Sequence, residues 1–332
     1  MSLIDLLVKI MHIALVAGLV LPLIAAVMVW AERRVSAFMQ DRLGPNRVGP
    51  AGLLQPIADL LKFIFKEDVV PGHVNRVLYI LAPALALVPA LIAFSVVPYA
   101  RGMAIADLNV GILLVFAISS LGVYGITIGG WASNSKYSLL GGVRSSAQMI
   151  SYELALGLSV IPVFLVVGEL NLEAVIAWQK ANCWLIWPLF PAFVVFLVAS
   201  YAETNRLPFD LPEAETELVA GYHTEYSSMK FALFFMAEYI NMVTASALLV
   251  TLFFGGYTMP FLELPAGTWG TFLSGLFFAA KVSFFLFLFI WVRWTLPRFR
   301  YDQLMNLGWK VMLPFSLVLI LATAGVRAFV TG

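Results

Sequence analysis

The sequence predicts an all-α polytopic membrane protein, with eight transmembrane helices and one amphipathic helix at the cytoplasmic interface. Three observations support this fold class. The 332-residue chain is 61% hydrophobic, its mean hydropathy is +0.93, and its apolar residues gather in runs of about twenty. A soluble domain of this composition would expose more apolar surface than soluble monomers tolerate. No internal repeat or low-complexity linker divides the chain, so residues 1–332 are predicted to form a single membrane domain.

Each apolar run of about twenty residues is long enough to cross the hydrocarbon core as a helix. The first run is too long for the apolar core of a signal peptide, and it ends in Glu32-Arg33-Arg34, so we expect it to remain as an anchor. The predicted spans are 6–30, 77–97, 109–131, 147–167, 184–202, 231–254, 272–291 and 311–330.

The distribution of Lys and Arg predicts the orientation of these spans. The first, third, fifth and seventh loops together carry 15 of the 20 basic residues, whereas the even loops and both terminal regions carry four. Because cytoplasmic loops are enriched in Lys and Arg, the odd loops are expected in the cytoplasm and both termini on the periplasmic side. Nothing resembles a transit peptide, so the sequence favours a bacterial plasma (inner) membrane over a mitochondrial inner membrane.

Residues 50–66 are apolar but too interrupted to span a bilayer. Their polar side chains recur every three or four residues and form one stripe, made of Gln55, Asp59, Lys62 and Lys66. The opposite face is apolar and carries Leu53, Ile57, Leu60, Leu61 and Ile64. This pattern is typical of an interfacial amphipathic helix. The arginines nearby are expected to bind lipid headgroups or a cytoplasmic partner, together with those that follow the seventh span. They are Arg33, Arg34, Arg42, Arg47, Arg293, Arg298 and Arg300.

An acidic segment in the third cytoplasmic loop, residues 202–225, is the most informative feature of the chain. Six of the 19 acidic residues lie there, between two long apolar runs: Glu203, Asp210, Glu213, Glu215, Glu217 and Glu225. Acids beside or inside lipid are costly and usually mark a proton or substrate path. We therefore expect this acidic cytoplasmic loop, about residues 203–230 in all, to carry the function.

Further charged residues lie within or at the ends of the predicted spans, namely Glu32, Glu153, Glu203, Glu238 and Lys281. Burial favours reversible protonation of such carboxyl groups. The structural alternative is that the acids simply pair with neighbouring arginines or reach the interface, and for Glu32, beside Arg33 and Arg34, the two interpretations are equally supported. For Glu153 and Glu238, with no basic residue within one turn, the functional interpretation is favoured. Lys281 is either a counter-ion or a relay group.

The sequence predicts no metal site on this chain. Cys183 is its one cysteine, so neither a disulfide framework nor a thiolate cluster can form within it. The three histidines, His12, His73 and His223, are too far apart in sequence for a local metal motif. Any redox metal is expected in a partner.

Several segments together identify a family. ERRVSAFMQDRLGPNRVGPAGLLQPIADLLKFIFKED, GWASNSKYSLLGGVRSSAQMISYE, AETNRLPFDLPEAETELVAGYHTEYSS, FFMAEY and PRFRYDQLMNLGWK resemble the H subunit of respiratory complex I, the NADH:quinone oxidoreductase. The resemblance covers essentially the whole chain. It implies a non-autonomous enzyme subunit that forms the membrane end of a quinone tunnel, docks the peripheral arm and begins a line of buried charges toward the proton-pumping arm.

The resemblance also implies roles for individual residues. Those expected at the quinone tunnel are Arg33, Asp59, Glu203, Arg206, Asp210, Arg293 and Arg298. Those expected in proton coupling are Glu32, Glu153, Glu213, Glu215, Glu217, Glu225, Glu238 and Lys281. Quinone, either ubiquinone or menaquinone, would be a bound substrate, and FMN and iron–sulfur clusters would lie only in partner subunits. The implied partners are peripheral-arm subunits of the B and C/D type, membrane subunits of the A, J and K type, and membrane lipids, with no nucleic acid.

Three other functions fit part of the sequence. A stand-alone secondary transporter would also use eight spans with buried carboxyl groups, but the long charged cytoplasmic loops favour a docked partner. The membrane subunit of an energy-converting hydrogenase is related, although the complete amphipathic helix and acidic loop favour the quinone enzyme; a deazaflavin-dependent or photosynthetic relative is a further alternative within that class. A purely structural scaffold would not need acids inside the membrane.

Overall fold

The computed structural model describes residues 3–210, 219–260, 262–263 and 265–331, and within these ranges regular structure is helical, without an extended strand. A bilayer offers no water to backbone N–H and C=O groups, so an apolar span satisfies them internally as a helix. In chain order the α-helices are α1 (Leu3–Leu15), α2 (Leu21–Met39), α3 (Gln55–Phe65), α4 (Arg76–Ala93), α5 (Gly111–Ala132), α6 (Lys136–Val167), α7 (Leu172–Ala181), α8 (Phe190–Glu203), α10 (Ser228–Phe253), α11 (Thr268–Thr295), α12 (Tyr301–Asn306) and α13 (Leu313–Thr331). Short helices are η1 (Val16–Val20), η2 (Pro50–Gly52), η3 (Phe94–Val96), η4 (Gly221–His223) and η5 (Leu307–Met312).

The predicted fold class is confirmed. Seven continuous helices in the described part of the chain are long and apolar enough to cross a membrane, and α8 is a shorter apolar helix at the fifth predicted span. Two of the seven contain a π-helical stretch, η1 between α1 and α2 and η5 between α12 and α13.

The prediction for the fifth span is wrong at its start. It begins not at residue 184 but at Phe190, with Pro191 in the first turn, where proline is best tolerated. Hydropathy also missed α7, a ten-residue helix whose start is capped by Asn171, which accepts hydrogen bonds from the backbone N–H groups of Glu173 and Ala174.

Three helices extend about ten residues further at the predicted cytoplasmic ends than hydropathy indicates, and the eighth is one of them, beginning at Tyr301 instead of residue 311. The first continues to Met39, so Glu32 belongs to a helix and faces the protein interior with 5% of its surface exposed. The fourth begins at Lys136 instead of residue 147. Charged and polar residues lower the hydropathy average in these turns, although they are compatible with a helical backbone.

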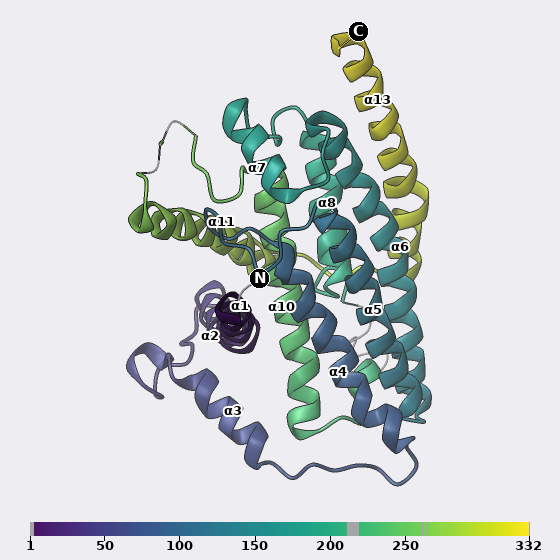
Figure 1. The fold of residues 1–332 in the computed structure, drawn as a ribbon. Helices are drawn as coiled ribbons and strands as arrows, with labels where there is room; N and C mark the ends of the chain where they lie inside the picture. Colours follow the sequence, from purple (N-terminus) through teal and green to yellow (C-terminus); the bar gives the residue numbers. More distant parts are fainter. Residues whose placement is uncertain (1–2, 211–218, 261, 264, 332) are drawn as a thin grey trace.

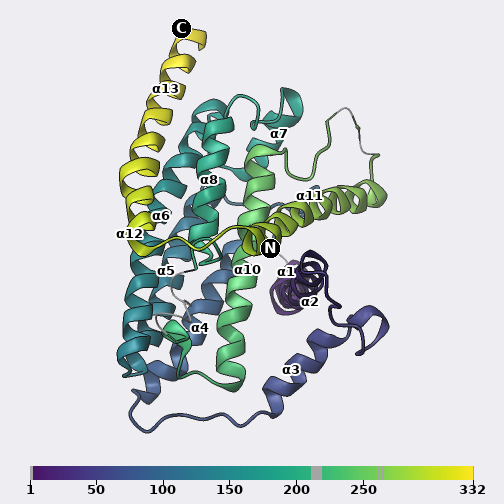
Figure 2. The same cartoon turned by 180° about the vertical axis from the view of Figure 1, so that it is seen from behind.

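The helices α4, α5, α6, α8 and α10 run alongside one another as a bundle, with α13 against α6 (Figures 1 and 2). In Figure 1, α2 is seen nearly end-on and α11 lies across the bundle, so both are steeply inclined to it, and α3 lies beside α2 and the start of α10. The most buried candidate span is α10, with 72% of its apolar window inside the protein, against 11% for the helix ending in α13. The core is therefore centred on α10.

Glycines allow the closest approaches in this bundle. A Cβ atom on Gly125 of α5 would lie 2.5 Å from the backbone nitrogen of Ala86 on α4. A Cβ atom on Gly141 of α6 would lie 2.7 Å from the Cα atom of Gly221. Small residues let membrane helices pack backbone to backbone, and at Gly141 they bring the end of the acidic region onto α6.

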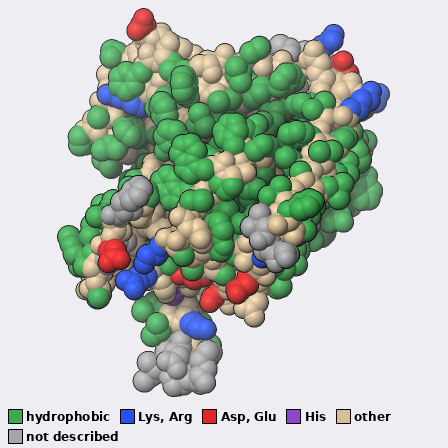
Figure 3. Space-filling view, turned by 90° about the horizontal axis from the view of Figure 1, so that it is seen from above, with side chains coloured by type: hydrophobic (Ala, Val, Ile, Leu, Met, Phe, Trp, Pro, Cys, Tyr) green, Lys and Arg blue, Asp and Glu red, His purple; other side chains and the backbone are tan. Residues whose placement is uncertain are grey.

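The amphipathic helix exists as α3, starting five residues later than predicted and preceded by η2. Its apolar side chains remain exposed over 48–83% of their surface in Ile57, Leu60, Leu61, Ile64 and Phe65, whereas Asp59 faces α2. In the space-filling view of the whole molecule, hydrophobic side chains dominate the face and charged ones gather toward its edges (Figure 3). The location of α3 at the cytoplasmic interface stays a prediction.

Candidate functional site

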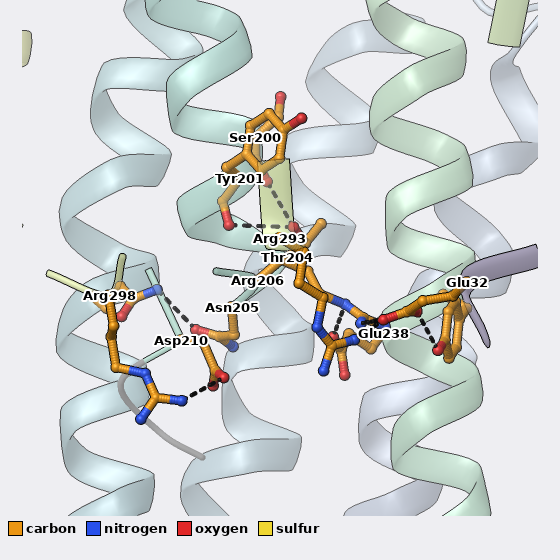
Figure 4. Close-up of polar contacts among 12 residues, drawn as sticks. Glu32, Ser200, Tyr201, Thr204, Asn205, Arg206, Asp210, Glu238, Arg293 and Arg298 are labelled. Atoms are coloured by element: carbon orange, nitrogen blue, oxygen red, sulfur yellow. Dashed lines mark hydrogen bonds and ion pairs between the residues drawn. The ribbon is translucent and has the colours of Figure 1, made fainter. Parts of the chain in front are cut away.

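Five side chains from four distant segments meet inside the protein (Figure 4). We call them the Glu32 cluster: Glu32 of α2, Arg206 after α8, Glu238 and Tyr239 of α10, and Arg293 of α11. Four of them, all except Tyr239, were singled out from sequence as separate charged residues. The structure brings them together.

Glu32 is the centre of this cluster. Its two carboxylate oxygens each accept a hydrogen bond of 3.2 Å from Nη1 of Arg206, one accepts a 2.6 Å hydrogen bond from the hydroxyl of Tyr239, and the other pairs with Nη1 of Arg293. Arg206, 3% exposed, also forms an ion pair with Glu238 through Nε. Its guanidinium lies 4.5 Å from the centroid of the Tyr239 ring. A buried charge of either sign is stable only when it is paired and hydrogen-bonded in this way.

The local fold explains why Arg206 points inward. Helix α8 ends at Glu203, and the hydroxyl of Thr204 donates to the carbonyl oxygens of Ser200 and Tyr201, as drawn in Figure 4. Asn205 then adopts the left-handed conformation with φ +51°, which Asn tolerates better than most residues. This reversal turns Arg206 back toward α10.

Two further ion pairs flank the cluster. Arg298 donates to Asp210 at 3.1 Å, and Asp210 is buried with 6% exposure. Arg33 of α2 donates to Asp59 of α3 at 2.6 Å, where the side chains are 48% and 18% exposed. The first pair joins the acidic segment to the chain after α11, and the second joins α3 to α2 next to Glu32.

The alternative that Glu32 pairs with the arginines next to it in sequence is wrong. Its arginine partners are Arg206 and Arg293, whereas Arg33 binds Asp59 and Arg34 donates to the carbonyl oxygen of Pro45. Glu238, which has no basic residue within one turn of sequence, likewise finds Arg206 across the fold.

Glu203 connects the Glu32 cluster to a second group of polar residues. It lines two small cavities of about 30 Å³ each. That volume suffices for about one or two waters. Glu238 lines one cavity, Ser119 and Thr244 line the other, and Asn241 lines both. Glu153 of α6 is near enough for its charge to act on Glu203.

The remaining predicted residues lie apart from the cluster. Glu225 is half-buried, and its backbone carbonyl accepts a 2.6 Å hydrogen bond from Tyr79. Lys281 donates to the carbonyl oxygens of Phe254, Gly256 and Thr258 at 2.5–2.9 Å, beyond the far end of α10 from Glu238. Among the described residues it makes no ion pair. The predicted coupling residues Glu213, Glu215 and Glu217 lie outside the described residues.

Sequence reasoning missed two functional candidates. Tyr239 belongs to the FFMAEY segment, directly after Glu238, but only the fold places its hydroxyl on Glu32. Asn241 follows one turn from Glu238 on α10, and this spacing on a helix face was the available signal.

Comparison with known proteins identifies the family. The model of the NADH dehydrogenase family matches residues 11–324. The chain is 54% identical to NADH-quinone oxidoreductase subunit 8 of Rhodothermus marinus, covering 95% of this chain and 97% of the relative. The chain belongs to this family. The H subunit of the NADH-quinone oxidoreductase from Salinibacter ruber is 54% identical with 92% of both chains covered, and the H subunit from Rickettsia felis is 54% identical with 95% of this chain and 93% of the relative covered.

Membership in the NADH dehydrogenase family confirms the resemblance to the H subunit of complex I and the expectation of a non-autonomous oxidoreductase subunit. It favours that interpretation over a stand-alone transporter. Because the match covers nearly the full length of chain and relatives, the Glu32 cluster, the acidic segment and α3 all lie inside the shared region.

Proposed function

We propose that this chain forms the membrane part of the quinone tunnel in a proton-translocating NADH:quinone oxidoreductase and couples quinone reduction to proton pumping through buried carboxyl groups. It would act in a bacterial plasma membrane with both termini on the periplasmic side. Electrons from NADH would reach the quinone, ubiquinone or menaquinone, through FMN and iron–sulfur clusters in partner subunits. The single observation that carries the proposal is the Glu32 cluster, because acids and arginines buried together within a membrane protein are costly and usually functional.

The tunnel would run past the inclined helices α2 and α11 and the amphipathic helix α3. Arg33 and Asp59 lie at the contact of α2 and α3, and Arg293 approaches Glu32 from α11. The exposed apolar face of α3 is suited to an isoprenoid tail, because burying such a tail removes apolar surface from water. The polar residues would meet the headgroup end of the path.

The coupling would be electrostatic. A quinone that has received electrons carries negative charge until protons reach its oxygens, and this charge would attract Arg293, the most exposed arginine of the cluster at 24%. The formal charge of the cluster is zero, from two acids and two guanidinium groups. Partial withdrawal of Arg293 would leave Glu32, Arg206 and Glu238 with an excess of one negative charge, which favours uptake of a proton. Glu238, Glu203 and Glu153 would then pass the disturbance into the membrane.

The cytoplasmic surface after α11 would help to dock the peripheral arm, through the B and C/D type subunits. The side chain of Arg300 is 75% exposed, and Arg298 holds the acidic segment through Asp210. Membrane subunits of the A, J and K type would cover apolar faces elsewhere, and lipid would cover the rest. Arg298→Ala and Arg300→Ala should weaken attachment of the arm, and unchanged co-purification of the arm would contradict this part of the proposal.

The coupling proposal is tested by replacing Glu153, Glu203 and Glu238 singly with Gln in the assembled complex. Quinone reduction and proton pumping are measured in proteoliposomes, with NADH:ferricyanide reduction as the control for an intact peripheral arm. We expect pumping or quinone reduction to fall while ferricyanide reduction is kept. Variants that retain both membrane activities would overturn the proposal.

A further inference from the structure

The C-terminal end of α3 is held by a short stretch at the start of α10. Residues 227–230 contact the chain at residues 63–69, about 160 positions earlier in the sequence. We call these contacts the α3 clamp: Ser227 with Val69, Ser228 with Phe63 and Lys66, and Lys230 with Asp68. None of these residues belongs to the tunnel or coupling sets.

Ser228 is the central residue of the clamp. Its hydroxyl lies 2.8 Å from the carbonyl oxygen of Phe63 and 3.0 Å from that of Lys66. These carbonyls belong to the end of α3, where a helix has no further N–H groups of its own to offer. Ser228 is 4% exposed and has φ +54°, a left-handed conformation that side-chain-bearing residues adopt rarely. Tertiary contacts therefore hold this serine in place.

The neighbouring contacts reinforce the same connection. The hydroxyl of Ser227 accepts from the backbone N–H of Val69 at 3.2 Å and approaches its carbonyl oxygen at 3.4 Å. Lys230 forms an ion pair of 2.5 Å with Asp68, and the lysine side chain is only 13% exposed. The ring of Phe231 packs against Phe63 of α3 with centroids 6.2 Å apart.

The first half of α3 and the preceding η2 are attached to α2. The indole N–H of Trp30 donates to the carbonyl oxygen of Ala51 at 3.1 Å, and Arg33 donates to Asp59. Helix α3 therefore bridges α2 and the start of α10, as its position beside both in Figure 1 also indicates. Each of these two helices carries a member of the Glu32 cluster: Glu32 precedes Arg33, and Glu238 lies ten residues after Ser228.

We propose that Ser228 is a positioning residue for the quinone path, which sets where α3 lies and so where its apolar face meets the isoprenoid tail. The inference rests on the proposed tunnel function and adds a residue to it. A tail long enough to reach α3 would depend on the clamp, whereas a short-tailed quinone would contact mainly the headgroup end. The clamp is therefore expected to act on the KM for long-tailed quinones.

The test uses Ser228→Gly and Ser228→Ala in the assembled complex, with Ser120→Ala as the matched control. Ser120 also carries a hydroxyl on a helix, but that hydroxyl is exposed and donates to Ala117 within its own helix. We expect both Ser228 variants to raise the KM for a ten-isoprene quinone by about fivefold, the loss of one hydrogen bond. In the Ser228 variants, the KM for a short-tailed analogue and the rate of NADH:ferricyanide reduction should stay unchanged. In Ser120→Ala, the KM for the ten-isoprene quinone should stay unchanged as well.

The two Ser228 variants separate the hydroxyl from the backbone, because Gly accepts a positive φ without strain and Ala does not. A normal ratio of long-tail to short-tail KM in Ser228→Gly would overturn the inference, even if Ser228→Ala were impaired. If neither variant assembles, Asp68→Lys and Lys230→Asp decide: each should raise the long-tail KM, and their combination should restore it. Absence of that rescue would also overturn it.

Failure of this inference is distinguishable from failure of the proposed function. Glu32→Gln is measured in parallel, in complex that still retains this subunit: if it abolishes quinone reduction there while the clamp variants behave as the parent does, the tunnel stands and the clamp falls. If Glu32→Gln leaves quinone reduction of both tail lengths intact, the tunnel function itself is contradicted.

Discussion

Glu32→Gln is the most informative single substitution in this protein, because Glu32 is the acceptor for three side chains at once. Gln keeps the size of the side chain but removes the negative charge and turns an amide N–H group toward a guanidinium. The formal charge of the cluster would rise from zero to +1, since Arg206 and Arg293 would face Glu238 alone. Removing one partner of a buried ion pair typically costs about 3–5 kcal/mol.

A matched control involves the next residue of the same helix, Arg33. Asp59→Asn breaks the ion pair of Arg33, whose side chain is 48% exposed, and exposed pairs contribute about 0–1 kcal/mol. We therefore expect Glu32→Gln to destabilise this subunit by several kcal/mol more than Asp59→Asn, and to reduce quinone reduction with it. The measurement is the temperature at which the solubilised complex loses this subunit and its quinone reductase activity.

A double substitution tests the electrostatic reason directly. Arg293→Met added to Glu32→Gln returns the formal charge to zero, with Arg206 still paired to Glu238. The double variant should therefore recover part of the lost stability, as coupled neighbours do in a double-mutant cycle. Equal effects of Glu32→Gln and Asp59→Asn, or strictly additive effects in the cycle, would refute the reasoning.

Three further outcomes are expected. Burial among aromatic rings lowers the pKa of His223 to about 4. Between pH 6.5 and 4 the unfolded chain therefore binds more protons than the folded chain, so the stabilisation present above pH 6.5 is lost as the pH falls. His223→Phe should remove about 3 kcal/mol of this pH dependence in acid unfolding. Lys281→Met leaves three carbonyl oxygens without their donor and should lower thermal stability by about 1–3 kcal/mol; loss of pumping at unchanged stability would instead favour a role in proton coupling. Gly125→Ala should separate α4 from α5 and cost about 1–3 kcal/mol in the melting of the complex, whereas Gly157→Ala, with no atom within 4 Å of the added Cβ, should be neutral.

The Glu32 cluster and the α3 clamp place polar contacts at two positions along α10, about ten residues apart. Glu238 and Tyr239 face α2 and Arg206, while the start of the same helix holds α3 through Ser228. A change in the position of α10 would therefore affect the charge cluster and the amphipathic helix together. This arrangement gives the proposed coupling a physical route that does not require the acids alone to carry it.

Features that depend on residues close together in the sequence could be predicted from the sequence alone. Apolar runs of about twenty residues identified the spans, because a helix is the structure that satisfies a backbone in lipid. The periodicity at residues 50–66 identified α3, and the long motifs identified the family. Prediction from local hydropathy failed at residues 184–189 and at Leu172–Ala181, where turns and capping side chains decide the structure.

Which charges meet depended instead on how the helices pack. Glu32 stands beside two arginines in sequence, yet its partners Arg206 and Tyr239 lie 174 and 207 residues away. The same holds for Ser228, whose hydroxyl reaches Phe63 across 165 residues. The physical reason is that a buried charge or carbonyl is stable only beside whichever partner the packed helices bring within hydrogen-bond reach. That distance is set by how α2, α3, α10 and α11 cross, which no local pattern in the chain specifies.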